Sequence, residues 1–149
     1  TLRTSFIVGY PGETDKEFAE LCEFVRAAEF DWMGTFAYSD QEGATAHELE
    51  GKLSLKEIER RRKHLMQIQQ GISKRKKKSL RGKQFDVLLE GASEESDLLL
   101  EGRSEMHAQE IDGKLYIADL PEGLTPTPGE FYRAEITETH DYDVVARIV

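Results

Sequence analysis

The stretch RTSFIVGYPGET, residues 3–14, decides the fold of the first part of the chain. Its near-continuous apolar centre predicts a strand over residues 3–10 that is buried on both faces, ended by the proline and glycine that follow. Thr14 and Glu17 then have the spacing of a capping box, which predicts the start of a helix. Apolar residues at helical spacing continue this helix for about four turns: Phe18, Leu21, Cys22 and Val25.

A second β-prone run covers residues 32–38, and its separation from the first by a helix predicts a parallel crossover unit. A mostly polar loop follows over residues 39–53. Ser54 and Glu57 repeat the capping-box spacing, and a long amphipathic helix is expected to run from there to about Lys78. The apolar stripe expected on this helix consists of Leu55, Ile58, Leu65, Ile68 and Ile72.

Beyond this helix the hydrophobic period changes from helical to alternating, with turn signals between the runs. Such a pattern predicts a five-stranded antiparallel barrel of the oligonucleotide-binding kind. The sequence therefore predicts two domains, an α/β domain over residues 1–80 and an all-β domain over residues 81–149. The expected strands of the second domain are Gln84–Leu89, Leu98–Glu101, Leu115–Ala118, Phe131–Thr137 and Tyr142–Val149.

The charge of the chain is concentrated in its second part. The whole chain has a formal net charge of -9. Residues 81–149 alone carry -10, because they hold six lysines or arginines against sixteen acidic residues, and the remaining residues carry +1. Such a field attracts basic partners and repels phosphate backbones. The basic run of residues 74–78 is interpreted as a solvated helix end, where cations suit the helix dipole, in preference to a nucleic-acid patch.

The cysteine count and the length of the apolar runs bear on two questions, whether the chain holds a metal site and where in the cell it acts. The one cysteine, Cys22, cannot by itself hold an iron–sulfur cluster or a structural metal, so no metal site is expected in this chain. No apolar run reaches the length of a membrane span, and the first residues lack the pattern of a signal peptide. A cytoplasmic location is therefore expected.

Two polar loops are candidates for a ligand site. Residues 9–13 follow the first strand, and residues 38–43 follow the second. In parallel α/β architectures ligands bind at the carboxyl ends of the strands, where glycines allow a close approach to the backbone. We therefore expect these loops to share one rim.

At these loops the sequence resembles the methylthiotransferase branch of the radical S-adenosylmethionine enzymes. The resemblance covers residues 4–14, then residues 36–39 with Glu42, Gly43 and Thr45 after them, and continues through residues 65–70 of the long helix. The remainder, opening with Gly82-Lys83 and having Tyr142-Asp143 near its last strand, resembles the TRAM domain. The resemblance implies that the chain is the C-terminal part of a larger enzyme, with the last strands of a partial (β/α) barrel followed by a TRAM barrel.

The resemblance also implies the cofactors. In the full-length enzyme two four-iron four-sulfur clusters and S-adenosylmethionine would generate a radical that abstracts hydrogen from the substrate carbon. The cluster cysteines would lie upstream, so this piece is expected to contain no catalytic residue and to be inactive alone. The residues implied at the S-adenosylmethionine pocket are Val8, Gly9, Tyr10, Gly12, Glu13, Ala37 and Tyr38.

Two branches of the family differ in substrate: one modifies transfer RNA, and the other modifies the β-carbon of an aspartate on small-subunit ribosomal protein number twelve. The acidic second domain favours the basic ribosomal protein, and residues 103–113 resemble that branch as well. A transfer-RNA enzyme with TRAM as its RNA-binding module, and a non-catalytic acidic binding module, remain as alternatives. The substrate contacts expected are Asp40, Glu42, Glu110 and Asp112.

Overall fold

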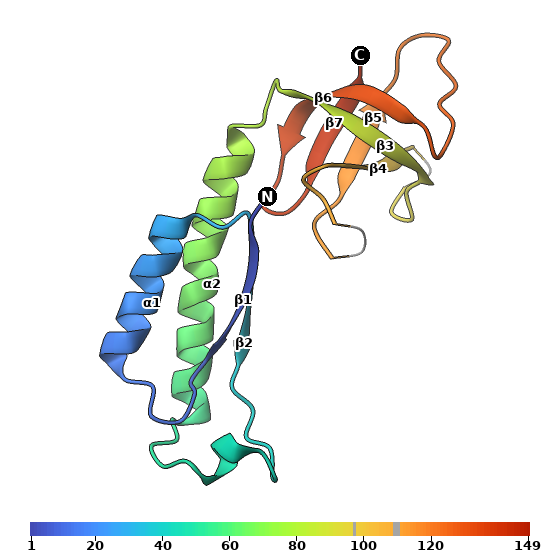
Figure 1. Ribbon diagram of the computed structural model, residues 1–149. Helices are drawn as coiled ribbons and strands as arrows, with labels where there is room; N and C mark the ends of the chain where they lie inside the picture. The colour runs from blue at the N-terminus through green and yellow to red at the C-terminus, as the bar shows by residue number, and fades with distance from the viewer. Residues whose placement is uncertain (97, 109–110) are drawn as a thin grey trace. The chain divides into compact units, whose positions relative to one another are not determined.

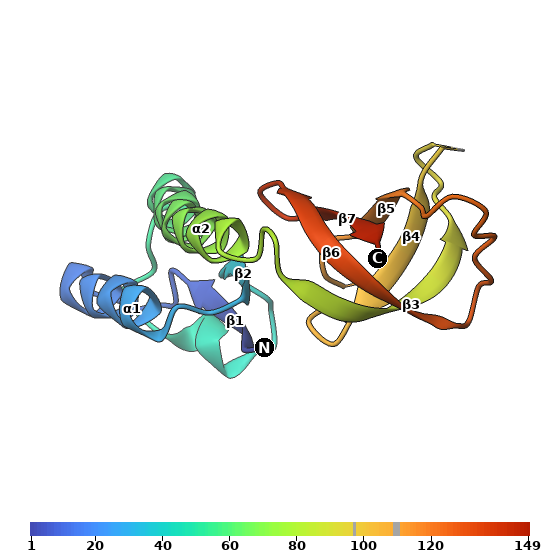
Figure 2. The same ribbon diagram turned by 90° about the horizontal axis from the view of Figure 1, so that it is seen from above.

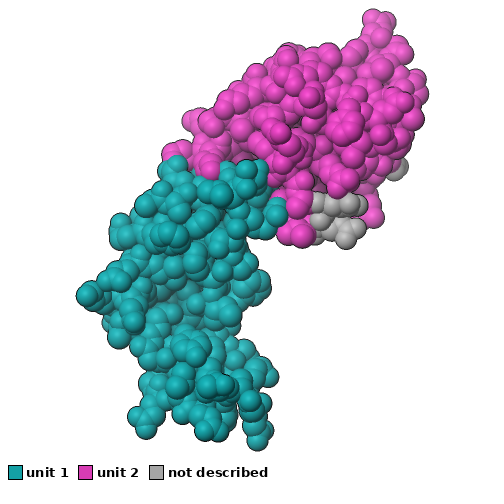
Figure 3. Space-filling model, viewed as in Figure 1, with its two compact units in different colours: residues 1–73 teal, residues 74–149 magenta. Residues whose placement is uncertain are grey.

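The computed structural model describes residues 1–149 except 97, 109 and 110. The chain forms two compact units, Thr1–Ser73 and Lys74–Val149 (Figure 3), each with a hydrophobic core of its own. The division falls inside a helix, α2 (Leu55–Lys78), whereas the sequence placed it after the helix at residue 80.

The first unit contains a two-stranded parallel sheet with both helices on one of its faces (Figures 1 and 2). Its order is β1 (Arg3–Val8), α1 (Asp15–Ala28), β2 (Trp32–Ala37), a short 3-10 helix (Thr45–Glu48) and α2. This order confirms the predicted crossover unit. The capping box of α1 is confirmed too, because the Glu17 amide donates to the Thr14 hydroxyl at 3.2 Å and the Thr14 amide donates to the Glu17 carboxylate at 2.8 Å.

The core of the first unit lies between the sheet and the helices, and Cys22 is buried in it. The prediction that the first strand is buried on both faces is wrong for this chain. Ile7 on β1 is 61% exposed and Phe36 on β2 is 59% exposed, because both side chains point away from the helices. The strand also ends at Val8 and not at Tyr10. The members of the core are Val8, Phe18, Cys22, Val25, Met33, Leu65 and Ile72.

The long helix follows the prediction in its extent but not at its first residue. It runs over Leu55–Lys78, and the Glu57 amide donates to the Ser54 hydroxyl at 3.2 Å, as the predicted cap requires. Leu55, however, is 82% exposed, so it does not belong to the buried stripe. Ile58, Leu65 and Ile72 are buried, as the spacing predicted.

The second unit is a closed barrel with the strand order β3-β4-β5-β7-β6. The predicted number of strands is confirmed, but the prediction that all of them are antiparallel is wrong. β5 and β7 run parallel, with Leu115 opposite Val144. The reason is geometric, because a closed ring of five strands cannot reverse direction at every neighbour. The strands are β3 (Gln84–Ala92), β4 (Leu100–Ser104), β5 (Leu115–Asp119), β6 (Phe131–Thr139) and β7 (Val144–Ile148).

Each strand differs from its predicted bounds at one end or both, and two of these differences have a local reason. β3 continues past Leu89 through a bulge at Gly91, whose φ of 146° lies outside the range that most side chains tolerate. β4 begins at Leu100 because Leu98 is 89% exposed and makes no part of the ladder. The alternating inward residues of the five strands form the barrel core: Val87, Leu89, Leu115, Ile117, Ala134, Ile136, Val144, Ala146 and Ile148.

Candidate functional site

The turn after β1 is a tight, hydrogen-bonded loop. The Glu13 amide donates to the Tyr10 carbonyl at 2.9 Å, and the Gly12 amide donates to the Gly51 carbonyl at 2.9 Å. The Glu13 side chain folds back along the turn, and its carboxylate accepts a hydrogen bond from the Gly9 amide at 2.9 Å. The turn is thus closed by one of its own side chains.

Glycine is required at position 9 for two independent reasons. Its φ is 81°, a left-handed conformation that costs other residues energy. A Cβ atom placed there would lie 2.5 Å from Cγ1 of Ile58 on α2. The turn can therefore approach α2 closely only because residue 9 has no side chain.

The end of β2 lies beside this turn. Val8 pairs with Ala37, and the Tyr38 amide donates to the Val8 carbonyl at 2.9 Å. The rings of Tyr10 and Tyr38 meet edge to face, with centroids 5.7 Å apart. The structure thus places the seven residues proposed for the cofactor pocket together at the carboxyl ends of the two strands: Val8, Gly9, Tyr10, Gly12, Glu13, Ala37 and Tyr38.

Asp40, one of the expected substrate contacts, lies close to this edge but is held by its neighbours. It accepts hydrogen bonds from Lys52 at 2.8 Å and from the Tyr38 hydroxyl at 3.2 Å, and it contacts Nδ1 of His47 at 3.0 Å. The hydrogen bonds to Lys52 and His47 hold the pKa of Asp40 below its ordinary value. Glu42 follows in the same exposed loop.

The other two expected substrate contacts belong to the second unit. Asp112 accepts a hydrogen bond from the Ala108 amide at 2.7 Å, and both residues lie between β4 and β5. Glu110 lies outside the described residues. The four expected contacts are therefore divided between the two units of the chain.

One residue of the first unit escaped the sequence reasoning. Arg61 on α2 is 3% exposed at its side chain and contacts Glu13, Asp15 and Glu57. Its guanidinium also lies 5.2 Å from the ring centroid of Phe18. Nothing in the pattern distinguished Arg61 from Arg60 and Arg62, because three consecutive arginines on a helix are typical of a solvated face.

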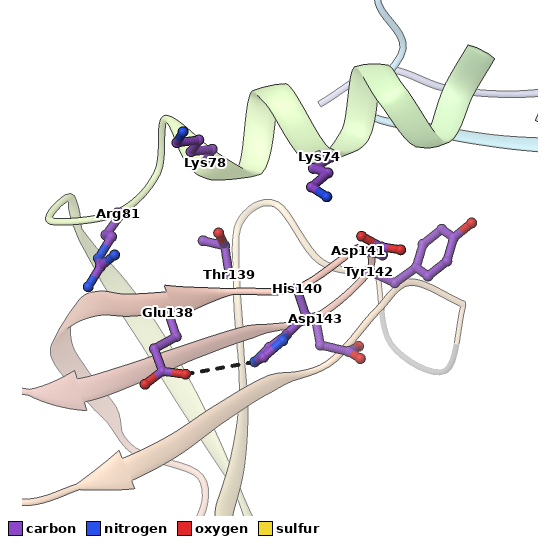
Figure 4. A pocket seen from close by; sticks show the side chains of 9 residues that line it. All are labelled: Lys74, Lys78, Arg81, Glu138, Thr139, His140, Asp141, Tyr142 and Asp143. Carbon is purple, nitrogen blue, oxygen red and sulfur yellow. Dashed lines mark ion pairs between the residues drawn. The ribbon is translucent and has the colours of Figure 1, made fainter. Parts of the chain in front are cut away.

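The second unit has a hollow of about 920 Å³ beside the end of α2 (Figure 4). Lys74, Lys78 and Arg81 lie on its basic side, and the connection between β6 and β7 forms the other side. Lys77, which is not one of the lining residues, donates to the Asp141 carbonyl at 3.2 Å and lies 5.5 Å from the ring centroid of Tyr142. Burial lowers the pKa of Lys77 to about 8.

A second hollow, of about 640 Å³, lies on the outer face of the barrel over β3, β4 and β6. Phe131 on this face is 70% exposed, and it lies opposite Leu88 in the β3–β6 ladder. Beside them Arg133 pairs with Asp86 at 3.0 Å. This face joins an apolar surface to a strip of charged side chains, a combination that suits a polypeptide ligand.

Among the described residues no group of histidine, cysteine and acidic side chains could hold a metal ion. No helix of the described chain is long and apolar enough to span a membrane.

Comparison with known proteins gives related sequences along the whole chain. A family model described as the TRAM domain matches residues 82–149. The ribosomal protein uS12 methylthiotransferase RimO of Koribacter versatilis is 62% identical over 149 residues, which are all of this chain and 30% of that protein. Proteins of the same name from Solibacter usitatus and Sorangium cellulosum are 48% identical over 148 residues and 46% identical over 149 residues. They are matched over 99% and 100% of this chain, and over 32% and 30% of their own lengths. The chain thus spans about a third of the length of these relatives.

Proposed function

Because this chain belongs to the radical S-adenosylmethionine methylthiotransferase family and matches the C-terminal part of the ribosomal protein uS12 methylthiotransferases, we propose that it serves that reaction. In this proposal the longer protein adds a methylthio group to the β-carbon of an aspartate of the ribosomal protein. Residues 1–80 supply the last strands of the catalytic barrel, and residues 81–149 recognise the substrate.

The uncovered face of the β1–β2 sheet is the observation that carries this proposal. Ile7 and Phe36 are paired across the ladder and are both more than half exposed, although Val8, Met33 and Thr35 on the opposite face are buried. A two-stranded sheet is marginal by itself and gains stability when further strands extend it. The upstream two thirds of the proposed enzyme would supply those strands and enclose this face.

The edge formed by the two strand ends fits S-adenosylmethionine in its chemistry. Backbone groups of Val8 and Gly9 lie beside the aromatic rings of Tyr10 and Tyr38, and such surfaces suit a nucleoside. Bound S-adenosylmethionine would supply radical chemistry at an unactivated carbon. The residues of this chain would bind and orient it and exclude water from one side.

The iron–sulfur clusters do not fit this chain. Cys22 is 3% exposed and lies on α1 within the core, and a cluster needs several thiolate ligands. The proposal therefore assigns the cluster ligands to the upstream part of the enzyme, and it expects the present chain to be inactive by itself.

The acidic barrel supports recognition of a basic protein. Residues 81–149 carry a net charge of -10, which would raise the association rate of a basic ribosomal protein and repel the phosphates of transfer RNA. The exposed Phe131 offers an apolar contact within the same domain. In this proposal the barrel acts in the cytoplasm as the docking module of the enzyme.

A salt titration tests the partner. The 149-residue chain should bind purified uS12 protein, with an affinity that falls as ionic strength rises, and should not bind transfer RNA. Replacing three exposed carboxylates of the barrel, by Glu94→Gln, Glu105→Gln and Glu122→Gln together, should weaken binding to uS12 protein. The matched control makes the same charge change in the first unit with Glu20→Gln, Glu48→Gln and Glu50→Gln, and should bind as the unchanged chain does. Tight binding of transfer RNA at moderate salt would overturn the choice of partner.

A second experiment tests the reaction. The full-length protein, reconstituted with iron and sulfide, should bind S-adenosylmethionine and methylthiolate uS12 protein, which mass spectrometry detects on the modified aspartate. The 149-residue chain given the same treatment should show no cluster absorbance. A full-length protein that modified transfer RNA and left uS12 protein unchanged would contradict the proposal.

A further inference from the structure

The Arg61 side chain donates hydrogen bonds to three acidic residues of the first unit. Its Nη1 donates to the Glu13 carboxylate at 2.5 Å and to the Glu13 carbonyl at 3.1 Å. Its Nη2 donates to Asp15 at 2.7 Å, and its Nε donates to Glu57 at 2.9 Å. One buried guanidinium thus joins α2 to the turn after β1 and to the first residue of α1.

The contact with Glu13 reaches the turn itself. Arg61 binds one oxygen of the Glu13 carboxylate, and the other oxygen accepts the hydrogen bond of the Gly9 amide at 2.9 Å. The Glu13 side chain is only 14% exposed, so little water competes for these bonds. Arg61 therefore holds the carboxylate of Glu13 in place, and that carboxylate in turn holds the amide of Gly9.

The arrangement needs arginine and not any cation. The planar guanidinium fits several acceptors at fixed directions, whereas a lysine ammonium is a single point of charge on a flexible stem. The Phe18 ring, 5.2 Å from the guanidinium carbon, adds a face on which an arginine can stack. Burial alone lowers the pKa of Arg61, but the hydrogen bonds that it donates to Glu13 and Glu57 outweigh this effect and the pKa is raised. The side chain thus stays charged where it is buried.

We propose that Arg61 is a positioning residue which, through Glu13, holds the Gly9–Glu13 turn in the shape that binds S-adenosylmethionine. The proposal rests on the function proposed above and adds a residue that does not lie in the pocket. Ordering the turn before binding removes an entropic cost from the binding step. Where the turn is ordered only a tenth of the time, the apparent Kd of the cofactor would rise about tenfold.

Arg60 provides the matched control. It is the neighbour of Arg61 on α2 and pairs with the same carboxylate, Glu57, at 2.6 Å. Its side chain is 59% exposed, and the carboxylate to which it donates, Glu57, lies on its own helix. Arg60→Gln therefore removes a whole positive charge from the same stretch of α2, a larger electrostatic change than Arg61→Lys, without removing a contact to the turn.

The experiment uses full-length protein with Arg61→Lys, Glu13→Gln and Arg60→Gln. Thermal melting shows whether each variant is folded, hydrogen exchange of the peptide that covers residues 6–17 reports the order of the turn, and calorimetry gives the Kd of S-adenosylmethionine. Arg61→Lys and Glu13→Gln should speed exchange in that peptide and raise the Kd about tenfold. Arg60→Gln should leave both unchanged. Glu13→Gln keeps two carboxylate partners for Arg61, so the test survives a misfolded Arg61→Lys.

The outcomes separate this inference from the proposed function. Faster exchange with an unchanged Kd in the folded variants would overturn the positioning role and leave Arg61 a structural residue. Unchanged exchange in both variants would overturn the hold on the turn itself. A wild-type protein that bound no S-adenosylmethionine would contradict the proposed function and the cofactor half of the inference, while the exchange rates would still decide whether Arg61 orders the turn.

Discussion

Ile7 on β1 lies directly opposite Phe36 on β2, and the two side chains are 61% and 59% exposed. Paired large apolar side chains on an uncovered sheet face are a common sign of a surface that another part of a protein covers. The buried neighbours one residue away along each strand, Val8 on β1 and Thr35 on β2, show that the sheet has a packed side and an open side. This contrast gives the first prediction.

Replacing Ile7 by Ser should have different effects in two contexts. In the 149-residue chain the free energy of unfolding should change by no more than about 0.5 kcal/mol, because the side chain is already in water. In the full-length enzyme the same change should cost about 2–4 kcal/mol, because the proposed barrel encloses this face. Urea denaturation measures both. Val8→Ala is the control, since Val8 is 0% exposed and its loss should destabilise both proteins. Equal small effects of Ile7→Ser in both contexts would contradict the enclosed face.

Gly9→Ala should destabilise the chain by about 2–4 kcal/mol, because the added methyl group combines left-handed strain with overpacking against Ile58. Gly12→Ala has a similar φ of 84° but meets no atom within 4 Å, so it should cost only about 1 kcal/mol. Comparing the thermal unfolding of the two variants separates the cost of the left-handed backbone, which both variants share, from the cost of the steric clash with Ile58, which only Gly9→Ala has. Similar melting temperatures for both would show that the turn can move away from α2.

Glu57 predicts a stability change in acid. Hydrogen bonds from Arg60 and then Arg61 lower its pKa from 4.5 to about 2 in the folded chain. Because the folded pKa lies below the unfolded value, the stabilisation is present above pH 4.5 and is lost as the pH falls toward 2. The melting temperature of the wild type should therefore exceed that of Glu57→Gln at pH 6, and the difference should shrink toward pH 2. A difference that stayed constant over this range would show that the ionised carboxylate does not matter.

Lys77 predicts a second change of stability with pH, at alkaline pH, where its charged form is the unfavourable one. Burial lowers its pKa from 10.5 to about 8, so between these values the unfolded chain binds more protons than the folded one. This group therefore destabilises the fold below pH 8, and its unfavourable contribution fades as the pH rises to 10.5. Compared with the wild type, Lys77→Met should be relatively more stable at pH 7 than at pH 10 in urea denaturation. Lys78→Met, at the exposed neighbouring position, is the matched control for the loss of a lysine from this stretch.

Much of the fold follows from local signals in the sequence. The capping-box spacings at Thr14 and Ser54 located two helices, because a cap acts within one turn of its own chain. The change from helical to alternating period after Lys78 located the barrel and its five strands. The single cysteine and the acidic second part are properties of composition, so they needed no structure at all.

The tertiary structure decided what depends on contacts between distant residues. The sequence pattern does not distinguish Arg61 from its neighbours Arg60 and Arg62. Arg61 is the one that is buried because α2 packs against residues 13–15, which lie 46 to 48 positions earlier in the chain. The same holds for the parallel pairing of β5 with β7, which follows from closing an odd ring, and for the exposed face of β1, which depends on what lies across it. The hydrophobic period, the helix caps and the net charge depend on residues that are close together in the sequence. The burial of a side chain and the closure of the barrel depend on contacts between segments that are far apart in the sequence.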